Sequence, residues 1–386
     1  MRWLRNLAWG VMILWAFGAA VDLEGAWWTK RLTYNPGSSW ASDIALYGSS
    51  ISVVWSDDTP GNYEVYFKKS ADGGATWTAA KRLTYSGAWS IAPAIAVNGS
   101  AVYVVWGEYD DVTQQDEVYF RKSADGGATW KTAKRLTFTS DLNYWPHVGV
   151  DVAVNGANVF VTWHDDTQGS KEIFFRKSTD GGASWQASQR ITYGLGSSED
   201  PAVAVSAVSA YLAWHDDVSG ADEVYFCKSA DGGTSWKAVK RLTYNAGGSF
   251  SAALDVQGAN VFVAWADGTP GNNEVYFRKS TDAGGTWSTA KRLTFTSGDT
   301  ATPALNVDGS IIYLAWHDDT PGNNEVYFRR SGDGGVSWEA GQRLTFTAGW
   351  SGYPELAFNG AFVCVSYEDD TSGNSEIYLK RSSVSF

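Results

Sequence analysis

Short apolar runs separated by polar stretches follow one another along most of the chain. Within many runs apolar and polar positions alternate with a period of two, as in residues 64–70 (EVYFKKS), and this alternation is typical of β-strands. Gly, Asn, Asp, Ser and Pro fill the gaps between the runs. No segment of this part of the chain shows the 3.6-residue period of an amphipathic helix. The pattern therefore predicts an all-β protein.

The runs belong to a unit that is repeated seven times. Each copy contains the tripeptide Arg-(Leu/Ile)-Thr, whose arginines are Arg31, Arg82, Arg135, Arg190, Arg241, Arg292 and Arg343. The steps between them are 51, 53, 55, 51, 51 and 51 residues. Each tripeptide is followed by an aromatic residue that ends an apolar run, namely Trp55, Trp106, Trp163, Trp214, Trp265, Trp316 and Tyr367. A glutamate then opens the next run, at Glu64, Glu117, Glu172, Glu223, Glu274, Glu325 and Glu376.

Each unit contains four predicted strands, which in the first copy lie at about 43–47, 51–55, 63–69 and 80–84. Four-stranded units of this length, repeated four to eight times, indicate a β-propeller with antiparallel blades. The chain of 386 residues is long enough for two or three ordinary domains. The repeats instead predict one seven-bladed domain over residues 21–386.

The two ends of the repeat array complement each other. Residues 30–33 form a fourth strand without the three that should precede it, and the last unit stops at Phe386 without its fourth strand. We expect the N-terminal strand to complete the last blade and close the ring. Closure would pair both terminal strands, which would otherwise be exposed sheet edges.

A second motif, Ser-x-Asp-x-Gly-x-(Thr/Ser)-Trp, lies between the third and fourth strands of six units. Its aspartates are Asp72, Asp125, Asp180, Asp231, Asp282 and Asp333. The motif resembles the Asp box, or BNR repeat, of sialidases and related propellers, and the resemblance covers nearly the whole chain after residue 20. It implies a sialidase-like propeller fold, in which the boxes are structural. It says little about function, because Asp-box propellers include sialidases, xyloglucan-degrading enzymes, photosystem assembly factors and receptors.

The first 20 residues have the features of a secretory signal peptide. Arg2 and Arg5 precede an apolar run from Leu7 to Val21, and Gly18-Ala19-Ala20 supplies small residues for cleavage. An uncleaved anchor is the alternative. The sequence thus predicts a secreted or extracytoplasmic protein. Two cysteines, Cys227 and Cys364, provide no disulfide framework.

The formal net charge is −12, which argues against binding to nucleic acid or to anionic membranes. Much of the negative charge falls between the second and third strands, where 24 of 42 acidic residues lie and Lys171 is the one basic residue. The aspartates there are Asp57, Asp58, Asp110, Asp111, Asp165, Asp166, Asp216, Asp217, Asp267, Asp318, Asp319, Asp369 and Asp370. These loops and the connections between units share one face, here called the loop face, which is the ligand face in propellers of this family. The acidic loops could bind cations or sugar hydroxyls, or could simply be good turns.

Five aromatic residues of the connections between units do not follow from the repeat: Trp40, Trp89, Trp145, Trp350 and Phe250. Such residues could be platforms for sugar rings, or could pack between blades.

Three histidines, His164, His215 and His317, follow the second-strand Trp in different units, and we expect them to be partners of the adjacent aspartates. They are held apart by the ring, so they predict no metal site. Calcium could enter the acidic loops, but no loop has an EF-hand or comparable spacing, so no cofactor is assigned.

The 15 arginines lie in the first 20 residues, in the Arg-(Leu/Ile)-Thr tripeptides, or at the end of the third strand. None is expected on the loop face, whereas sialidases bind their substrate carboxylate there with three arginines.

We therefore favour a non-catalytic, monomeric binding module for a neutral glycan or an extracellular protein. In it, the loop-face aromatics and Asp57, Asp58, Asp165, Asp166, Asp216, Asp217, Asp318 and Asp319 would contact the ligand. The alternatives are a sialidase-like glycoside hydrolase using Asp110, Asp111 and Glu117, whose unit has an enlarged loop, or a surface scaffold.

Overall fold

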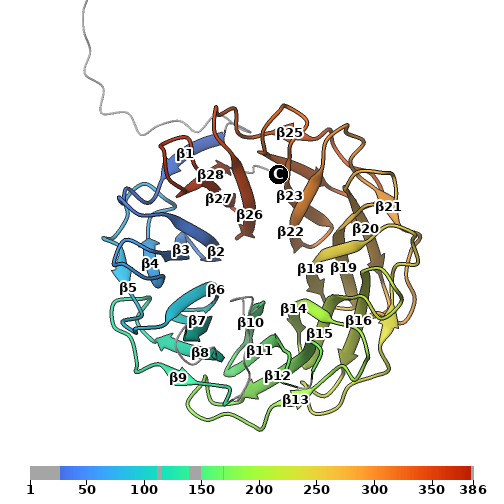
Figure 1. Cartoon of the computed structure of the whole chain (residues 1–386), viewed down its shortest axis with the longest axis horizontal. Helices are drawn as coiled ribbons and strands as arrows, with labels where there is room; N and C mark the ends of the chain where they lie inside the picture. Colours follow the sequence, from blue (N-terminus) through green and yellow to red (C-terminus); the bar gives the residue numbers. More distant parts are fainter. Residues whose placement is uncertain (1–26, 111–114, 139–148, 168, 384–386) are drawn as a thin grey trace, which may run out of the picture.

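The computed structural model describes residues 27–110, 115–138, 149–167 and 169–383. They form seven four-stranded antiparallel sheets arranged as a ring (Figure 1). Blade 1 contains β2 (Ser39–Tyr47), β3 (Ser50–Asp57), β4 (Glu64–Ser70) and β5 (Lys81–Arg82), and blade 2 contains β6 (Trp89–Asn98), β7 (Ala101–Asp110), β8 (Gln115–Ser123) and β9 (Lys134–Arg135). Blade 3 contains β10 (Val150–Asn155), β11 (Asn158–Asp165), β12 (Glu172–Ser178) and β13 (Gln189–Arg190). Blade 4 contains β14 (Ser198–Ser206), β15 (Ser209–Asp216), β16 (Glu223–Ser229) and β17 (Lys240–Arg241).

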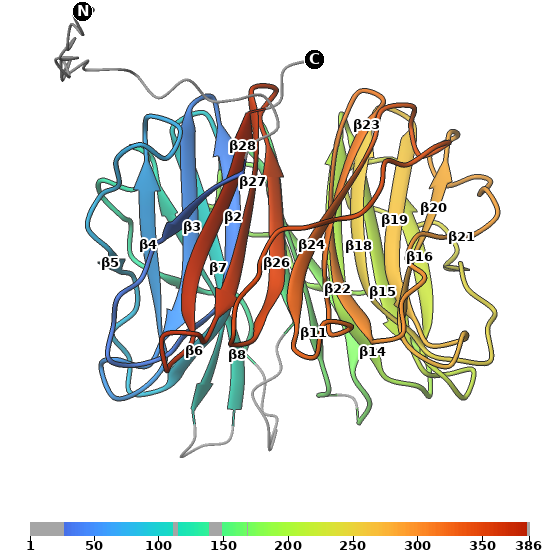
Figure 2. The same ribbon diagram turned by 90° about the horizontal axis from the view of Figure 1, so that it is seen from above.

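The remaining three blades follow the same order. Blade 5 contains β18 (Ser249–Gln257), β19 (Asn260–Asp267), β20 (Glu274–Ser280) and β21 (Lys291–Arg292), and blade 6 contains β22 (Thr300–Asp308), β23 (Ile311–Asp318), β24 (Glu325–Ser331) and β25 (Gln342–Arg343). Blade 7 contains β26 (Ser351–Phe358), β27 (Phe362–Asp369), β28 (Glu376–Ser383) and β1 (Trp27–Arg31). The first strand of each blade lies innermost, around the central axis (Figure 1), and the strands run along that axis (Figure 2).

The predicted ring closure is confirmed. β1 pairs antiparallel with β28, with Trp27 opposite Ser382 and Arg31 opposite Tyr378. The predicted signal peptide, residues 1–20, lies outside the described residues. Within the described part of the chain, no helix is long and apolar enough to cross a membrane. Cys227 and Cys364 are buried and free, and burial raises the pKa of both thiols.

The innermost strand is longer than the sequence predicted, because it begins with a bulge. In blade 1 it starts at Ser39 rather than near residue 43, and the register shifts between Trp40 and Asp43. Ala41, within the bulge, has a φ of 50°, a left-handed conformation that residues with a Cβ rarely adopt. The equivalent bulge residues with positive φ are Ala92, Asp200, Ser251, Thr302 and Tyr353.

The outermost strand is shorter than predicted, and the Arg-(Leu/Ile)-Thr tripeptide explains why. After Arg82 the Thr84 hydroxyl, rather than a backbone carbonyl, accepts the N–H of Val65, at 2.8 Å. Leu83 is buried in the core, and Arg82 bonds Glu64 at 2.5 Å. The same ion pair recurs as Arg31–Glu376, Arg135–Glu117, Arg190–Glu172, Arg241–Glu223, Arg292–Glu274 and Arg343–Glu325.

Each Asp box forms a compact turn. In the fifth blade, Ser280 Oγ donates to Asp282 Oδ1 at 2.7 Å and accepts the N–H of Gly284 at 2.8 Å. Asp282 Oδ1 also accepts the N–H of Thr286 at 2.7 Å. These bonds to the ionised form lower the pKa of Asp282 to about 2. Trp287 then packs edge-on against Phe226 of the preceding blade, with ring centroids 5.0 Å apart. The box therefore fixes a turn and joins two blades.

The innermost strands carry aspartates that the repeat does not predict. Asp43 on β2 accepts the N–H of Ile44 at 2.6 Å and, through its other oxygen, the N–H of Ile95 on β6 at 2.7 Å. Asp151 and Asp255 bridge β10 to β14 and β18 to β22 in the same way, through the N–H groups of Val203 and Val307. These carboxylates thus link blades 1 and 2, 3 and 4, and 5 and 6 at the axis.

Candidate functional site

The first aspartate of the acidic loops serves the loop itself in most blades. Asp57 is 0% exposed and accepts hydrogen bonds from Ser39 Oγ at 2.7 Å, Asn35 Nδ2 at 2.5 Å and the N–H of Thr59 at 3.0 Å. It thereby ties the loop to the connection that enters the same blade. Its equivalents Asp216, Asp267, Asp318 and Asp369 are buried as well, whereas Asp165 is partly exposed. The turn interpretation therefore accounts for the buried members of this set.

The second aspartate lies closer to the surface. Asp58 Oδ1 accepts the N–H of Ser38 at 2.7 Å, Asp217 Oδ1 accepts that of Ser197 at 2.7 Å, and Asp319 Oδ1 accepts that of Asp299 at 2.7 Å. Asp217 is exposed, and Asp58, Asp166 and Asp319 are partly exposed. These residues carry the negative charge that the loop face presents to solvent.

Blade 2 departs from this scheme. Its loop was expected to place Asp110 at the position of Asp57, and the cross-strand register shows that this is wrong. Asp57 pairs with Glu64 across blade 1, but in blade 2 Glu108 pairs with Glu117. Glu108, rather than Asp110, therefore occupies the position of Asp57. The hairpin continues beyond it and pairs Asp110 with Gln115, while Asp111 lies outside the described residues.

Glu117, one of the carboxylates proposed for catalysis, has a structural environment. It is 5% exposed, forms the ion pair with Arg135, and accepts a hydrogen bond from the Thr137 hydroxyl. Its six equivalents pair with arginine in the same way. Among the described residues, the second carboxylate oxygen of those six glutamates has no hydrogen-bond partner, so the bond from Thr137 is particular to Glu117. The ion pair that Glu117 shares with its equivalents is structural.

Two of the predicted aromatic platforms lie together in a row along the loop face of blades 1 and 2. The ring centroids of Trp40 and Tyr63 are 5.2 Å apart, those of Tyr63 and Trp89 5.7 Å, and those of Trp89 and Tyr109 5.8 Å. Trp40, Tyr63 and Trp89 are partly exposed, and Tyr109 is buried. We call these four residues the aromatic row. The two tyrosines were not singled out from the sequence, because only the fold places them between the tryptophans.

The other predicted platforms lie elsewhere. Trp350 contacts Tyr353 and His317, with ring centroids 5.3 Å and 6.2 Å apart. Phe250 lies in β18 and is partly exposed. Trp145 falls outside the described residues. The structure therefore does not gather all five aromatics into one site.

Two of the histidines contact residues of the bulges in the innermost strands. The predicted pairing of the histidines with the adjacent aspartates stays a prediction. His164 Nδ1 accepts the N–H of Asp200 at 3.2 Å. His317 Nδ1 lies 2.8 Å from Thr302 Oγ1 and 3.4 Å from the N–H of Tyr353. Burial lowers the pKa of His317 to about 4, so the ring is neutral at neutral pH.

A strongly perturbed carboxylate of the loop face, Asp116, lies between blades 2 and 3. Burial and the nearby charges of Asp166, Glu117 and Asp165 raise the pKa of Asp116 to about 7, and Lys171 opposes them. Lys171 itself bonds Glu199 of blade 4, with Nζ and Oε2 2.7 Å apart. Strongly perturbed groups of this kind are frequent at functional sites. The sequence pointed to this junction through its enlarged loops, but not to Asp116 in particular.

The described residues form neither a metal site nor an arginine triad on the loop face. Among the described residues, no group of three or more His, Cys, Asp or Glu is placed to hold a metal ion. Seven of the described arginines form the ion pairs with glutamate given above. Arg121, Arg176, Arg278 and Arg329 donate to backbone carbonyls of the preceding blade. Arg330 is paired with Glu339, and Arg381 lies over the Phe362 ring.

Comparison with solved structures finds the same propeller fold in carbohydrate-active proteins. The polysaccharide lyase Uly1 is 8% identical with a TM-score of 0.61, covering 89% of this chain and 90% of that one. The endosialidase of phage phi92 is 10% identical with a TM-score of 0.56, covering 93% and 69%. An α-L-arabinofuranosidase of Fusarium graminearum is 15% identical with a TM-score of 0.53, covering 76% and 93%. At these identities the likeness concerns the fold alone.

Comparison with curated proteins finds no match. The model of the BNR repeat-like domain, by contrast, matches residues 159–365, more than half of the chain. This match agrees with the six Asp boxes and with the closed ring of seven four-stranded blades. The chain therefore belongs to the family of BNR repeat-like domain proteins.

Proposed function

We propose that this protein is a carbohydrate-binding protein and that the aromatic row on the loop face contacts the sugar. The row carries the proposal, because three neighbouring rings that are only partly buried offer successive apolar surfaces at the edge of the fold. An aromatic face is negatively polarised and attracts the C–H groups of a sugar ring. Ligand sites commonly combine such apolar surfaces with a few polar groups.

The ligand that suits this face is neutral. The exposed aspartates of the loops give the face a negative potential, which disfavours anionic sugars. The arginines of the described residues are engaged in ion pairs, carbonyl contacts or a ring contact. The loop face therefore does not present the guanidinium groups that would bind the carboxylate of a sialic acid. We further propose that the chain is exported through residues 1–20 and acts as a monomer outside the cytoplasm. A protein partner is the alternative ligand.

Glycan-array screening with the purified protein tests the proposal. We expect binding to neutral oligosaccharides, weakened at least tenfold by Trp89→Ala. Tyr244→Ala, which removes an exposed aromatic side chain far from the row, is the control and should leave affinity within twofold. Absence of any neutral glycan ligand would overturn the proposal and favour a protein partner.

A second function, glycoside cleavage, is favoured by one observation at the junction of blades 2 and 3. The pKa of Asp116 is about 7, and the nearby charges of Asp165 and Asp166 contribute to raising it. A carboxyl group that keeps its proton near neutral pH, beside other carboxylates, is the arrangement that glycosidases use for acid and base catalysis. The solved structures of similar fold are named as hydrolases and a lyase.

A hydrolysis assay on the glycans that bind would separate the two functions. If the protein is an enzyme, Asp116→Asn should abolish turnover while retaining binding, because the amide cannot donate a proton to the leaving oxygen. Binding without measurable turnover in the wild type would instead support the non-catalytic role.

A further inference from the structure

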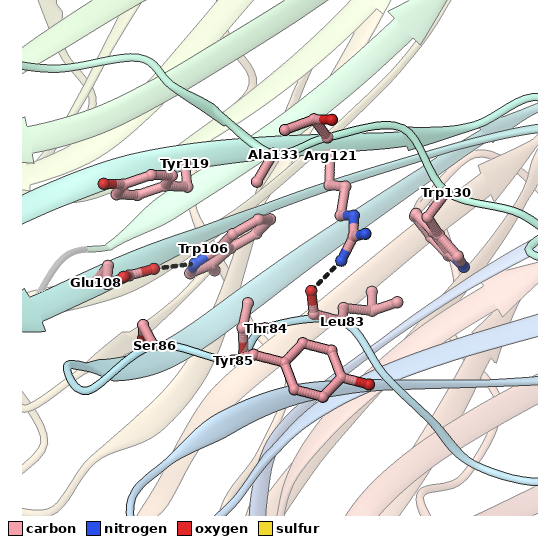
Figure 3. A pocket seen from close by; sticks show the side chains of 11 residues that line it. Leu83, Thr84, Tyr85, Ser86, Trp106, Glu108, Tyr119, Arg121, Trp130 and Ala133 are labelled. Atoms are coloured by element: carbon pink, nitrogen blue, oxygen red, sulfur yellow. Dashed lines mark hydrogen bonds between the residues drawn. The ribbon is translucent and has the colours of Figure 1, made fainter.

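A groove of about 370 Å³ lies between blades 1 and 2 (Figure 3). One side is formed by residues 83–86, which leave blade 1, and the other by β7, β8 and the segment after β8. Clefts that bind small molecules typically have volumes of about 300–1,000 Å³. The groove is therefore large enough for a ligand of the size of one or two sugar rings.

Four aromatic side chains line the groove, namely Tyr85, Trp106, Tyr119 and Trp130. Trp106 and Tyr119 are stacked, with centroids 5.8 Å apart and planes at 16°. Tyr85 is 74% exposed and projects from the rim, where Arg82 stacks on it at 4.6 Å. The groove thus has an apolar floor and one aromatic wall that is almost free of other contacts with the protein.

Glu108 gives the groove its polar end, and here blade 2 differs from its sisters. In blades 1 and 5 the equivalent Asp57 and Asp267 are 0% exposed and accept hydrogen bonds from the hydroxyls of Ser39 and Ser249. Glu108 is partly exposed and lines the groove, where its Oε2 accepts the indole N–H of Trp106 at 3.1 Å.

The side chain of Glu108 is longer than that of Asp57 or Asp267, and its carboxylate does not bond the serine hydroxyl that those aspartates bond. Ser90 is the counterpart of Ser39 and is 0% exposed, yet within the described residues its hydroxyl has no hydrogen-bond partner. A buried hydroxyl without a partner destabilises the fold. Blade 2 therefore lacks a stabilising contact present in blades 1, 4, 5 and 7 and has an acidic group inside a groove instead.

We propose that the groove is a second carbohydrate site, which binds one neutral sugar residue between Tyr85 and Tyr119 with a sugar hydroxyl donating to Glu108. The class of ligand rests on the proposed function, but the groove and the aromatic row share no residue. Burial raises the pKa of Glu108 and so disfavours its ionised form, which suits a hydroxyl donor better than a cation.

The groove offers an anionic sugar no unengaged cation. Arg121 is the one cationic residue of the lining. Its Nη1 donates to the carbonyl of Leu83 (Figure 3), and its Nε donates to the carbonyl of Lys131. The site therefore selects for neutral hydroxyl groups, as the loop face does.

The test is calorimetric titration with cellohexaose, xylohexaose and mannohexaose, which are neutral probes. Glu108→Asp restores the residue of the sister blades and withdraws the carboxylate toward Ser90. We expect this variant to lose at least tenfold in affinity at one of two sites, with an unchanged or higher melting temperature. Tyr85→Ala should cause a similar loss, because it removes the exposed wall.

Tyr244→Ala is the matched control, since Tyr244 is about equally exposed and stacks on Arg241, but the next blade carries the buried Asp267 at the position of Glu108. It should leave binding unchanged. Trp40→Ala separates the two proposals: if it weakens hexaose binding while Glu108→Asp and Tyr85→Ala do not, the aromatic row is a site and the groove is not. If no hexaose binds the wild type, or only a cationic chitosan hexamer loses affinity in Glu108→Asp, the proposed groove ligand is wrong.

Discussion

At the scale of single residues, the arginine of each Arg-(Leu/Ile)-Thr tripeptide is held by three contacts. Arg292 bonds Glu274 at 2.6 Å, donates from Nε to the carbonyl of Thr294 at 2.8 Å, and lies 4.5 Å over the ring of Phe295. Glu274 is 0% exposed, so its charge depends on this arginine. A buried glutamate and its arginine partner therefore recur in every blade.

Removing this cation should destabilise the protein more than removing the pair. We expect Arg292→Met to lower the free energy of unfolding by about 2–3 kcal/mol, since a buried carboxylate is left without its partner. The double variant Arg292→Met/Glu274→Gln should recover part of that loss. Denaturant unfolding of the four proteins of this cycle measures the coupling, and purely additive effects would contradict the role given to the pair.

At the scale of secondary-structure elements, a cation at the end of the third strand bonds a backbone carbonyl of the preceding blade in five blades. Lys68 donates to the carbonyl of Leu32 at 2.6 Å, and Arg278 donates to that of Leu242. In blade 4 the same position is Cys227, which is buried and cannot make this bond. The junction between blades 3 and 4 consequently lacks a link that most other junctions have.

Arg278→Cys should reproduce this weaker junction between blades 4 and 5. Hydrogen bonds from charged groups contribute about 1.5–3 kcal/mol, so we expect a lower melting temperature. Lys237→Cys, at an exposed position, removes a positive charge and adds a thiol without touching a junction. An equal shift in both variants would show that the bond to Leu242 contributes nothing specific.

At the scale of the whole molecule, two sets of carboxylates respond to pH in opposite directions. On the innermost strands, burial raises the pKa of Asp43 and Asp255 to about 7 and that of Asp151 to about 6. Their protons are held more tightly in the folded than in the unfolded protein. In the Asp boxes, hydrogen bonds lower the pKa of Asp72, Asp282 and Asp333 to about 2.

These shifts predict maximal stability at mildly acidic pH. The aspartates of the innermost strands favour the folded state at pH below about 4, where they are protonated in both states, and lose this contribution as the pH rises from about 4 to about 7. The box aspartates stabilise the fold above about pH 4 and lose their contribution as the pH falls toward about 2. The melting temperature should therefore peak near about pH 4. Asp255→Asn should flatten the decline between about pH 4 and 7, and an unchanged slope would contradict the assignment.

The sequence by itself determined the number of blades, the closure of the ring by its N-terminal strand and the position of the Asp boxes. Each of these follows from local patterns that recur in every unit, such as the two-residue alternation of strand Glu274–Ser280. The bulge at Ala41 and the shortened strand at Arg82 were not predicted, because backbone conformation and a hydroxyl replacing a carbonyl leave no periodic signal.

Only the tertiary structure decided which groups come together between blades. The cross-strand register identified Glu108 as the counterpart of Asp57, and the packing of two blades placed Tyr63 between Trp40 and Trp89. Asp43, likewise, bonds a residue of the neighbouring blade. The physical reason is that a repeat specifies contacts within its own unit, whereas the exceptions to the repeat act across junctions that exist only once the ring has closed.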